Sequence, residues 1–235
     1  MVLDRAVQEA VALASGGVNG IIVENFFDAP FTKGTVDPAV VSAMTIVTSR
    51  LRQLVTVPIG INVLRNDAHS GLAIAACTGA EFIRVNVLTG TMATDQGLIE
   101  GDAHRLMRYR RELGVDTKVF ADVLVKHAAP VGAIFSETAM ADAVADTIHR
   151  GLADAVIVSG GATGHPPTIQ DLANAKAAAG ETPVLVGSGA TADNIPQLIK
   201  SADGIIVSSS LKRWGQIAQP VDPHRVSQFM DALPS

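Results

Sequence analysis

Short runs of apolar and β-branched residues alternate along the chain with longer segments whose apolar residues recur at helical spacing. A clear helical example holds Val40, Val41, Met44, Val47 and Leu51. Strict alternation of strand and helix predicts a parallel sheet with right-handed crossover connections. Seven runs have the length and composition of buried strands: Gly20–Asn25, Pro58–Leu64, Phe82–Val87, Lys118–Lys126, Ala155–Ser159, Pro183–Gly187 and Gly204–Ser208.

Seven strands spaced roughly 20–40 residues apart favour one α/β domain over residues 1–235, a (β/α)8 TIM barrel. A doubly wound open sheet is the alternative, but polar residues enter nearly every strand and no G-x-G-x-x-G follows an early strand. The chain opens with a predicted helix over Leu3–Ala14 and no strand before it. We therefore expect the barrel's N-terminal strand to be missing, and the two unpaired edges to favour a homo-oligomer.

Signals for the helix ends support this division. Asp102, Thr191 and Asp222 are suitable N-caps, and Pro223 fits the first position of the last helix. The single cysteine, Cys77, lies in a run of small apolar residues, which favours a buried structural thiol over a nucleophile.

Composition excludes several classes of protein. Hydrophobic residues make up 48% of the chain and charged residues 17%, which is typical of a globular protein. The net charge of −5 and the lack of a Lys/Arg run argue against a nucleic-acid partner. No apolar stretch approaches the roughly 20 residues of a transmembrane helix, and the N-terminus is no signal peptide, so we expect a cytoplasmic protein.

Glycine- and serine-rich turns follow the last three predicted strands. Small residues let the backbone approach an anion, and barrels commonly bind phosphate at the loops after their last two strands together with a short extra helix. The stretch from Ser209 to Trp214 is a candidate for that helix. The alternative is tight turn geometry alone. The candidate phosphate-binding residues are Gly160, Gly161, Gly187, Ser188, Gly189, Ser208 and Ser209.

Polar side chains follow the inner faces of the earlier strands. Alternation places Arg84 and Asn86 on one face of their strand, and Asp122, Leu124 and Lys126 on one face of the next. We expect the charged residues to meet near the barrel axis, because charges are rarely buried unpaired. The alternative is an ion-pair layer without chemistry. The catalytic candidates are Glu24, Asp122 and Lys126, and the substrate-binding candidates are Asn25, Asn62, Arg84 and Asn86.

Other chemistries find less support in the residues. Lys126 could form a Schiff base, but a neighbouring carboxylate opposes the low pKa which that role needs. A divalent metal on Glu24, Asp122 and a histidine lacks a recognisable ligand spacing, and no organic cofactor signature occurs. The segments 26–34 and 87–101 are long enough to act as lids, or, through the exposed aromatic residues of the first, as oligomer contacts.

Several segments together resemble the BtpA/SgcQ family over essentially the whole chain. They are Gly17–Phe26 with Asp28–Phe31, Phe82–Val87, Ala121–Val123 with Lys126-His127, Gly187–Thr191, Ala202–Val207 with Leu211-Lys212, and Val221–Pro223 with Arg225-Val226. The resemblance implies a barrel of the ribulose-phosphate-binding type. Members usually begin with a strand of the type Ile-Gly-Met-Ile-His-Leu and a Pro/Gly-rich loop, and this sequence lacks both.

The family resemblance implies two kinds of function. One branch is named for photosystem I biogenesis in cyanobacteria, and the other occurs among bacterial sugar-metabolism genes and is described as a nucleosidase or similar enzyme. We expect a phosphate-binding barrel that acts on a phosphorylated sugar or nucleoside-like metabolite as a nucleosidase, lyase or isomerase. The alternative is a non-catalytic assembly factor that acts through its surface.

Overall fold

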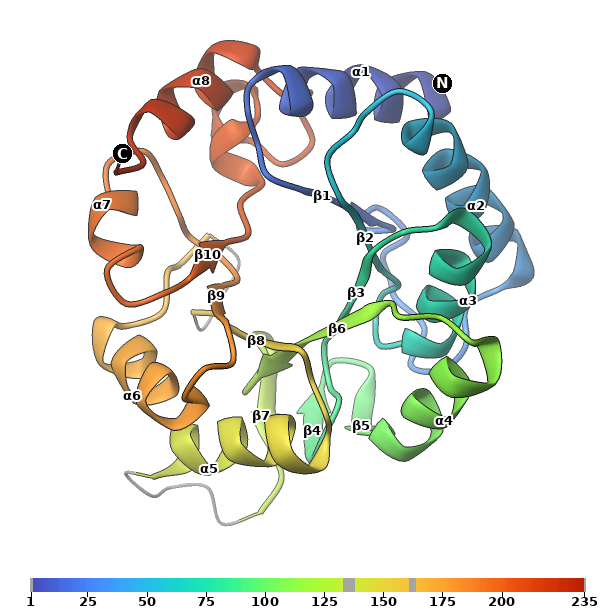
Figure 1. Ribbon diagram of the computed structural model, residues 1–235, viewed down its shortest axis with the longest axis vertical. Coiled ribbons are helices and arrows are strands. Elements are labelled where there is room, and N and C mark those ends of the chain that lie inside the picture. The colour runs from blue at the N-terminus through green and yellow to red at the C-terminus, as the bar shows by residue number, and fades with distance from the viewer. Residues whose placement is uncertain (1, 133–137, 161–163, 235) are drawn as a thin grey trace.

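The seven predicted strands form one parallel sheet in the computed structural model, which describes residues 2–132, 138–160 and 164–234. The sheet curls around a central axis (Figure 1). Each neighbouring pair of strands is parallel. In spatial order the strands are β1 (Ile21–Glu24), β2 (Ile59–Asn62), β3 (Phe82–Val85), β6 (Lys118–Val123), β8 (Ala155–Val158), β9 (Val184–Val186) and β10 (Gly204–Ile205).

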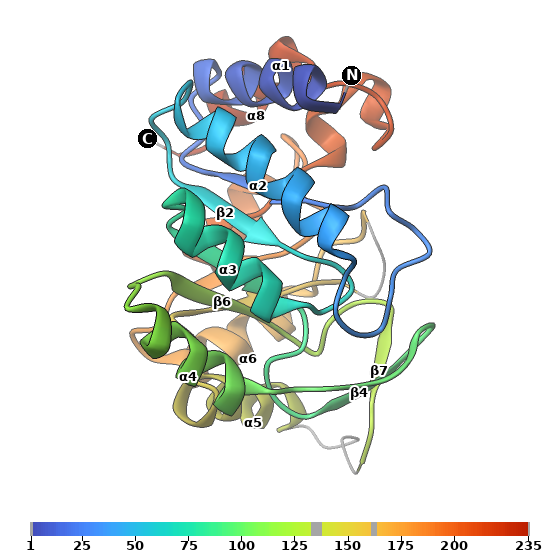
Figure 2. The same ribbon diagram turned by 90° about the vertical axis from the view of Figure 1, so that its right-hand side faces the viewer.

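Helices cover the outside of the curled sheet (Figures 1 and 2). The predicted caps at Asp102 and Asp222 are confirmed, since their side chains accept from the amides of Arg105 and His224. The helices are α1 (Val2–Ser15), α2 (Pro38–Arg52), α3 (Ala68–Thr78), α4 (Ala103–Leu113), α5 (Ala139–Ala145) continuing as the π-turn η1 (Asp146–Arg150), α6 (Ile169–Ala179), α7 (Ile195–Leu198) and α8 (Pro223–Asp231). Thr191 does not cap a helix directly, because α7 begins at Ile195 after an intervening turn.

The sheet is a (β/α)8-type barrel that stays open between two edges. β1 pairs with β2 and β10 pairs with β9, and no bridge joins β1 to β10 among the described residues. Helices α1 and α8 pack against each other outside this opening (Figure 1). The prediction of a TIM barrel with seven strands is thereby confirmed.

Alternating side chains fill the barrel in two layers. At the amino end of the strands the rings of Phe82 and Phe120 stack with centroids 4.6 Å apart. Gly60 leaves room for them, because a Cβ there would lie 2.1 Å from the Phe82 ring. The next inward residues, Arg84 on β3 and Asp122 on β6, form the polar layer above. The aromatic floor therefore directs the charged groups toward the carboxyl ends of the strands.

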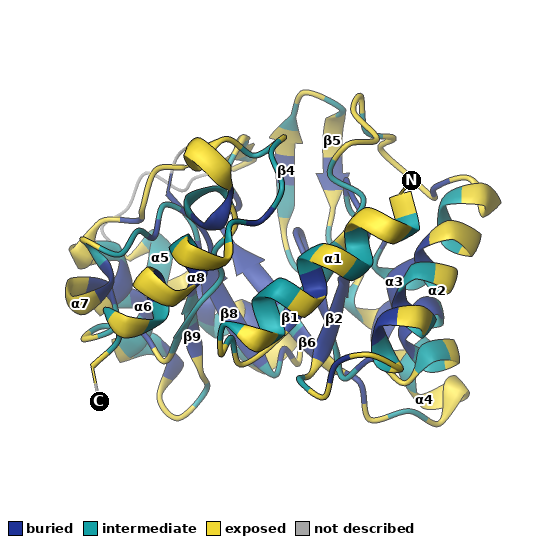
Figure 3. Cartoon of the chain, turned by 90° about the horizontal axis from the view of Figure 1, so that it is seen from above, coloured by how far each residue is buried: buried dark blue, intermediate teal, exposed yellow. Residues whose placement is uncertain are grey.

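A second, antiparallel sheet stands at the carboxyl end of the barrel (Figures 2 and 3). It consists of β4 (Thr91–Thr94), β5 (Gly97–Glu100) and β7 (Ala128–Pro130) in the order β5-β4-β7. The segment 87–101, expected to be a lid loop, is mostly this hairpin. Met92 faces Ile99 across it, and both pack on Val87 and Val125. This small apolar core fixes the segment on the barrel rim.

Two further local predictions are wrong. The strand expected over Lys118–Lys126 ends at Val123, because Leu124 has φ 49°, outside the extended region. Lys126 therefore reaches the barrel from a loop and does not share a strand face with Asp122. Cys77 is exposed, because α3 buries the face that carries Leu72, Ile74 and Ala75, and the cysteine lies on the other side.

Candidate functional site

A cavity of about 810 Å³ opens at the carboxyl ends of the barrel strands. Glu24 and Arg84 line it from β1 and β3, and Asn86 lines it from directly after β3. Arg65 and Lys126 line it from the loops after β2 and β6. The turns 187–191 and 206–210 line it from β9 and β10. The structure thus brings most of the predicted catalytic and phosphate-binding residues around one space, as expected where parallel strands end together.

Asp122 lies at the centre of a buried hydrogen-bond network. Its carboxylate accepts from Arg84 Nε at 2.9 Å and from the other arm of the same guanidinium at 2.8 Å. Asn86 Nδ2 and Ser159 Oγ donate to it at 3.0 and 3.3 Å. Burial lowers the pKa of Arg84, but the charge of Asp122 outweighs it and holds that pKa above its ordinary value. Both oxygens of Asp122 are therefore occupied, and the pair is fixed in place.

Glu24 differs from Asp122 because its carboxylate borders the cavity. The side chain is open to the cavity, while the barrel wall surrounds it on the other sides. Asn62 Nδ2 donates to Oε1 at 2.7 Å, from the residue directly opposite in register. Burial raises the pKa of Glu24 even though Arg84 and Lys126 act in the opposite direction. A carboxyl group with a raised pKa next to open space is suited to proton transfer.

Two buried amide oxygens beside these carboxylates lack a partner. Oδ1 of Asn62 and Oδ1 of Asn86 accept no hydrogen bond from the described residues, although Asn62 is 1% and Asn86 4% exposed. Asn86 lines the cavity. Its Oδ1 atom has almost no accessible surface, so the side chain borders the cavity without presenting this acceptor to it. The Asn25 side chain instead holds the loops at the rim of the barrel together, because it accepts from the Leu64 amide at 2.7 Å and donates to Asp28.

Arg65 is a cavity residue that the sequence analysis missed. It follows the end of β2, and its NH2 donates to the carbonyl of Lys126 at 3.0 Å. Its position directly after a buried strand was the available signal. Burial lowers the pKa of both Arg65 and Lys126, and Arg84 lowers that of Lys126 further. Neither cation takes part in an ion pair with any residue that the structure describes.

The glycine-rich turns after β8 and β9 pack closely on each other. The Gly160 amide donates to Ser188 Oγ at 3.2 Å, and Ser188 Oγ donates to the carbonyl of His165 at 2.9 Å. A Cβ on Gly189 would lie 2.1 Å from the nitrogen of Pro166. Gly187 leaves room for Ser159 and Arg84, because its Cβ would lie 2.4 Å from Ser159 Oγ. Gly187, Ser188 and Gly189 line the cavity, whereas Gly160 is not among its lining residues. Gly161 lies outside the described residues.

The end of β10 carries the predicted short helix as two 3-10 turns, η2 (Ser209–Leu211) and η3 (Arg213–Gly215). Ser210 Oγ donates to the carbonyl of Ala190 at 2.7 Å, which joins this segment to the turn after β9. Arg225, from α8, donates from Nε to the Ser210 carbonyl at 2.6 Å and lines the cavity beside Ser208 and Ser209. Sequence reasoning missed Arg225 as a site residue, because it lies far along the chain on a helix.

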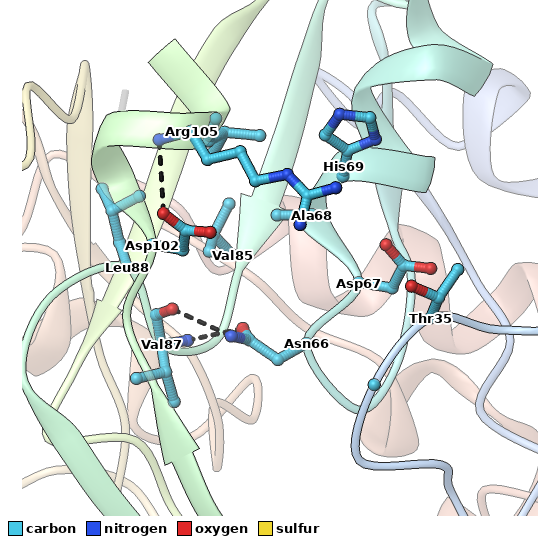
Figure 4. A pocket seen from close by; sticks show the side chains of 12 residues that line it. Thr35, Asn66, Asp67, Ala68, His69, Val85, Val87, Leu88, Asp102 and Arg105 are labelled. Carbon is cyan, nitrogen blue, oxygen red and sulfur yellow. Dashed lines mark hydrogen bonds between the residues drawn. The ribbon is translucent and has the colours of Figure 1, made fainter. Parts of the chain in front are cut away.

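A second pocket, of about 190 Å³, lies outside the barrel mouth between α3 and α4 (Figure 4). The Asn66 side chain bridges the amide and carbonyl of Val87. Asp67 caps α3 at Ser70 and binds the Val36 amide. Asp102 caps α4. The polar groups of this pocket serve local structure, so we assign it no function.

Two further features, a metal site and a membrane-spanning helix, were sought among the described residues. No group of three or more His, Cys, Asp or Glu side chains among them is arranged to hold a metal ion. No helix in the described part of the chain is both long and apolar enough to cross a membrane.

The sequence matches the model of one protein family and is similar to several individual proteins. The model of the BtpA family matches residues 1–235. The photosystem I biogenesis protein BtpA of Synechocystis is 66% identical over 99% of this chain and 79% of its own length. An uncharacterized protein of Thermococcus kodakarensis, TK2179, is 45% identical over 98% of this chain and 85% of its own length.

The fold is similar to that of solved barrel enzymes. Phosphoribosylanthranilate isomerase of Pyrococcus furiosus superposes with a TM-score of 0.63 at 16% identity, covering 95% of this chain and 92% of the isomerase. Orotidine 5'-phosphate decarboxylase of Pyrococcus horikoshii superposes with a TM-score of 0.62 at 16% identity, covering 98% and 93%. At these identities the likeness supports the α/β barrel fold alone.

Proposed function

The chain belongs to the BtpA family, and from this premise we propose that it is an enzyme that binds a phosphorylated sugar or nucleoside-like metabolite in the cavity at its strand ends. One observation carries the proposal. A single cavity has a carboxyl group with a raised pKa, Glu24, exposed on one wall and the turns after β9 and β10 with Arg225 on another. Barrel enzymes bind phosphate at this second position, and the two solved neighbours are named for phosphorylated compounds.

The phosphate would lie between the turns 187–191 and 208–210. Backbone amides there border the cavity, and Arg225 supplies a positive charge that no carboxylate among the described residues neutralises. Gly187 and Gly189 permit the close packing that holds this wall, and Ser208 and Ser209 are open to a ligand. A guanidinium group binds phosphate oxygens with two parallel donors.

Glu24 would carry the proton in the reaction. Its raised pKa moves its titration toward neutral pH, as a general acid or base needs. Asp122 was an equal candidate from the sequence, but its oxygens already accept four hydrogen bonds, so we propose that it positions Arg84. Asn86 lines the cavity and donates to Asp122, so it would help to position the substrate beside that carboxylate. Isomerisation, bond cleavage by a lyase and glycosidic hydrolysis all use such a proton transfer.

Binding and catalysis can be tested separately. The purified chain is screened by thermal shift against phosphorylated sugars and nucleotides, and the affinity of each stabilising compound is measured by calorimetry. We expect Arg225→Gln to weaken binding by about tenfold or more, equivalent to about 1.4 kcal/mol. Arg213→Gln is the matched control, because Arg213 lies nearby and exposed but outside the cavity. Glu24→Gln should keep the binding and lose turnover. A folded chain that binds none of these compounds would refute the proposal.

A second candidate function is photosystem I assembly through the protein surface. It is favoured by one observation, the 66% identity to the Synechocystis biogenesis protein over nearly the whole chain. The test is expression of this chain in Synechocystis that lacks its own BtpA. If wild type, Glu24→Gln and Arg225→Gln all restore photosystem I equally, the cavity is not needed and the assembly function is correct. If only the wild type restores it, the ligand site is needed.

A further inference from the structure

The cavity has a second positively charged wall opposite the proposed phosphate site. Arg65 follows β2 and Lys126 follows β6, whereas the proposed phosphate site follows β9 and β10. The strands β3, β6 and β8 lie between β2 and β9 in the sheet, so Arg65 reaches the cavity from the other side of the barrel. Both walls line the same space.

The two cations of this wall are held side by side. Arg65 donates from NH2 to the carbonyl of Lys126 at 3.0 Å, which positions its guanidinium next to that loop. Arg65 is 7% exposed, so its place is fixed by burial, and Lys126 is half-buried at the cavity surface. The remaining N–H groups of the guanidinium and the ammonium group of Lys126 are donors without a carboxylate partner in the described chain.

The nearby carboxylates are engaged elsewhere. Asp122 forms its two-armed ion pair with Arg84, and Glu24 accepts from Asn62. Asp95 also lines the cavity and attracts Arg65 across it, but it forms no ion pair with Arg65 and accepts from the Gln96 side chain at 2.5 Å. Burial lowers the pKa of Lys126, and Arg84 and Arg65 lower it further. The attraction to Asp122 and Glu24 raises this pKa but does not offset the decrease. A buried cation without a counter-ion costs free energy, and a bound anion would recover that cost.

Resting on the proposed function, we propose that the ligand carries two anionic groups, with its phosphate at the turns after β9 and β10 and a carboxylate or second phosphate between Arg65 and Lys126. The two ends of the molecule then bind opposite walls. Its middle lies beside Glu24 and Asn86, the groups proposed for proton transfer and substrate positioning. Both ends contribute binding free energy that positions the central carbons at Glu24.

Three probes with a five-carbon skeleton test this arrangement by calorimetry. Ribose 5-phosphate has one anionic group, 5-phosphoribonate adds a carboxylate at the other end, and ribulose 1,5-bisphosphate adds a phosphate there. We expect at least one two-anion compound to bind about tenfold or more tightly than ribose 5-phosphate, a gain of about 1.4 kcal/mol. Whichever of the two shows the larger gain identifies the second anionic group.

A single substitution assigns the gain to this wall. In Lys126→Gln the advantage of the two-anion ligand should fall by about tenfold, while ribose 5-phosphate keeps its affinity. Lys200→Gln removes a charge from an exposed lysine outside the cavity and should change neither value. Arg65→Lys is the second variant, which keeps the charge and loses the planar donor fork. Thermal unfolding of each variant shows that it is folded.

The outcomes separate this inference from the function on which it rests. Equal affinity for all three probes, or an equal loss for all three in Lys126→Gln, would overturn the two-anion ligand and leave the phosphate site standing. Failure of every probe and of every compound in the wider phosphate screen would overturn the proposed function together with this inference.

Discussion

The side chains of the polar layer differ in their partners, and this difference separates the structural residues from the proposed catalytic one. Alternation along β3 predicted that Arg84 and Asn86 share a face, and both in fact donate to Asp122. The sequence could not predict that Asp122 would be saturated while Glu24 borders open space, because that depends on the register of neighbouring strands. Lys126 was placed on the wrong element, because the positive φ at which the strand ends is adopted by Leu124, where no glycine or asparagine marks a turn.

Asp122 is the residue whose loss should unfold the barrel most readily. In Asp122→Asn the guanidinium of Arg84, which is 7% exposed, stays buried without its counter-charge. Removal of one partner of a buried pair costs about 3–5 kcal/mol of the free energy of unfolding. Urea denaturation measures the loss. Asp116→Asn is the control, because the ion pair of Asp116 with Lys118 is exposed and should contribute little. Similar stability of the two variants would show that the Arg84 charge needs no partner.

The number of barrel strands was predicted correctly, but their lengths were not. All seven barrel strands were found, because strands buried on both faces read as short apolar runs, as in Ala155–Val158. Each was drawn too long, since the polar residues at the strand ends belong to the loops of the site. The hairpin β4–β5 was read as a loop, because Thr91-Met92-Ala93-Thr94 does not alternate polar and apolar residues and only Gly97, with φ 94°, marks its turn.

The packing of the turn after β9 against the segment 164–166 makes a prediction about Gly189. This glycine has φ 75°, and a Cβ on it would meet the backbone of Pro166. Gly79 has nearly the same φ, 72°, with no atom within 4 Å of its Cβ position. Gly79→Ala should therefore lose only the conformational cost of about 1–2 kcal/mol. Gly189→Ala should lose a further 1–3 kcal/mol or so from overpacking.

Thermal or urea unfolding compares these two alanine variants, and calorimetry measures their affinity for a phosphorylated ligand. We expect only Gly189→Ala to weaken ligand binding, because it displaces the cavity wall. Equal stability of the two variants would mean that the segment 164–166 moves away without cost, and that the close approach does not shape the site.

The fold of the whole molecule was the property that the sequence predicted most directly, because strict strand–helix alternation is compatible with few topologies. The open side of the barrel was also foreseen. The sequence pattern did not predict how the opening is arranged. Helix α1 packs on α8 outside it, and the Lys212–Glu9 ion pair links the two ends of the chain. These contacts join residues about two hundred positions apart, and no local periodicity records them.

The opening between β1 and β10 predicts a gradient of protection across the sheet. β8 is paired on both edges and all four of its residues are buried, whereas β1 and β10 are paired on one edge and are partly exposed. In dilute solution amide hydrogen exchange should be slowest in β8 and fastest in β10, with β1 between them.

The unpaired edges of β1 and β10 can also pair with strands of another copy, so we expect a homo-oligomer at higher concentration. Exchange at β1 and β10 should then slow, with β8 unchanged, as light scattering reports a larger mass. If the mass rises and the edge strands exchange as before, the copies meet through another surface; if protection is uniform in a monomer, α1 and α8 alone stabilise the opening.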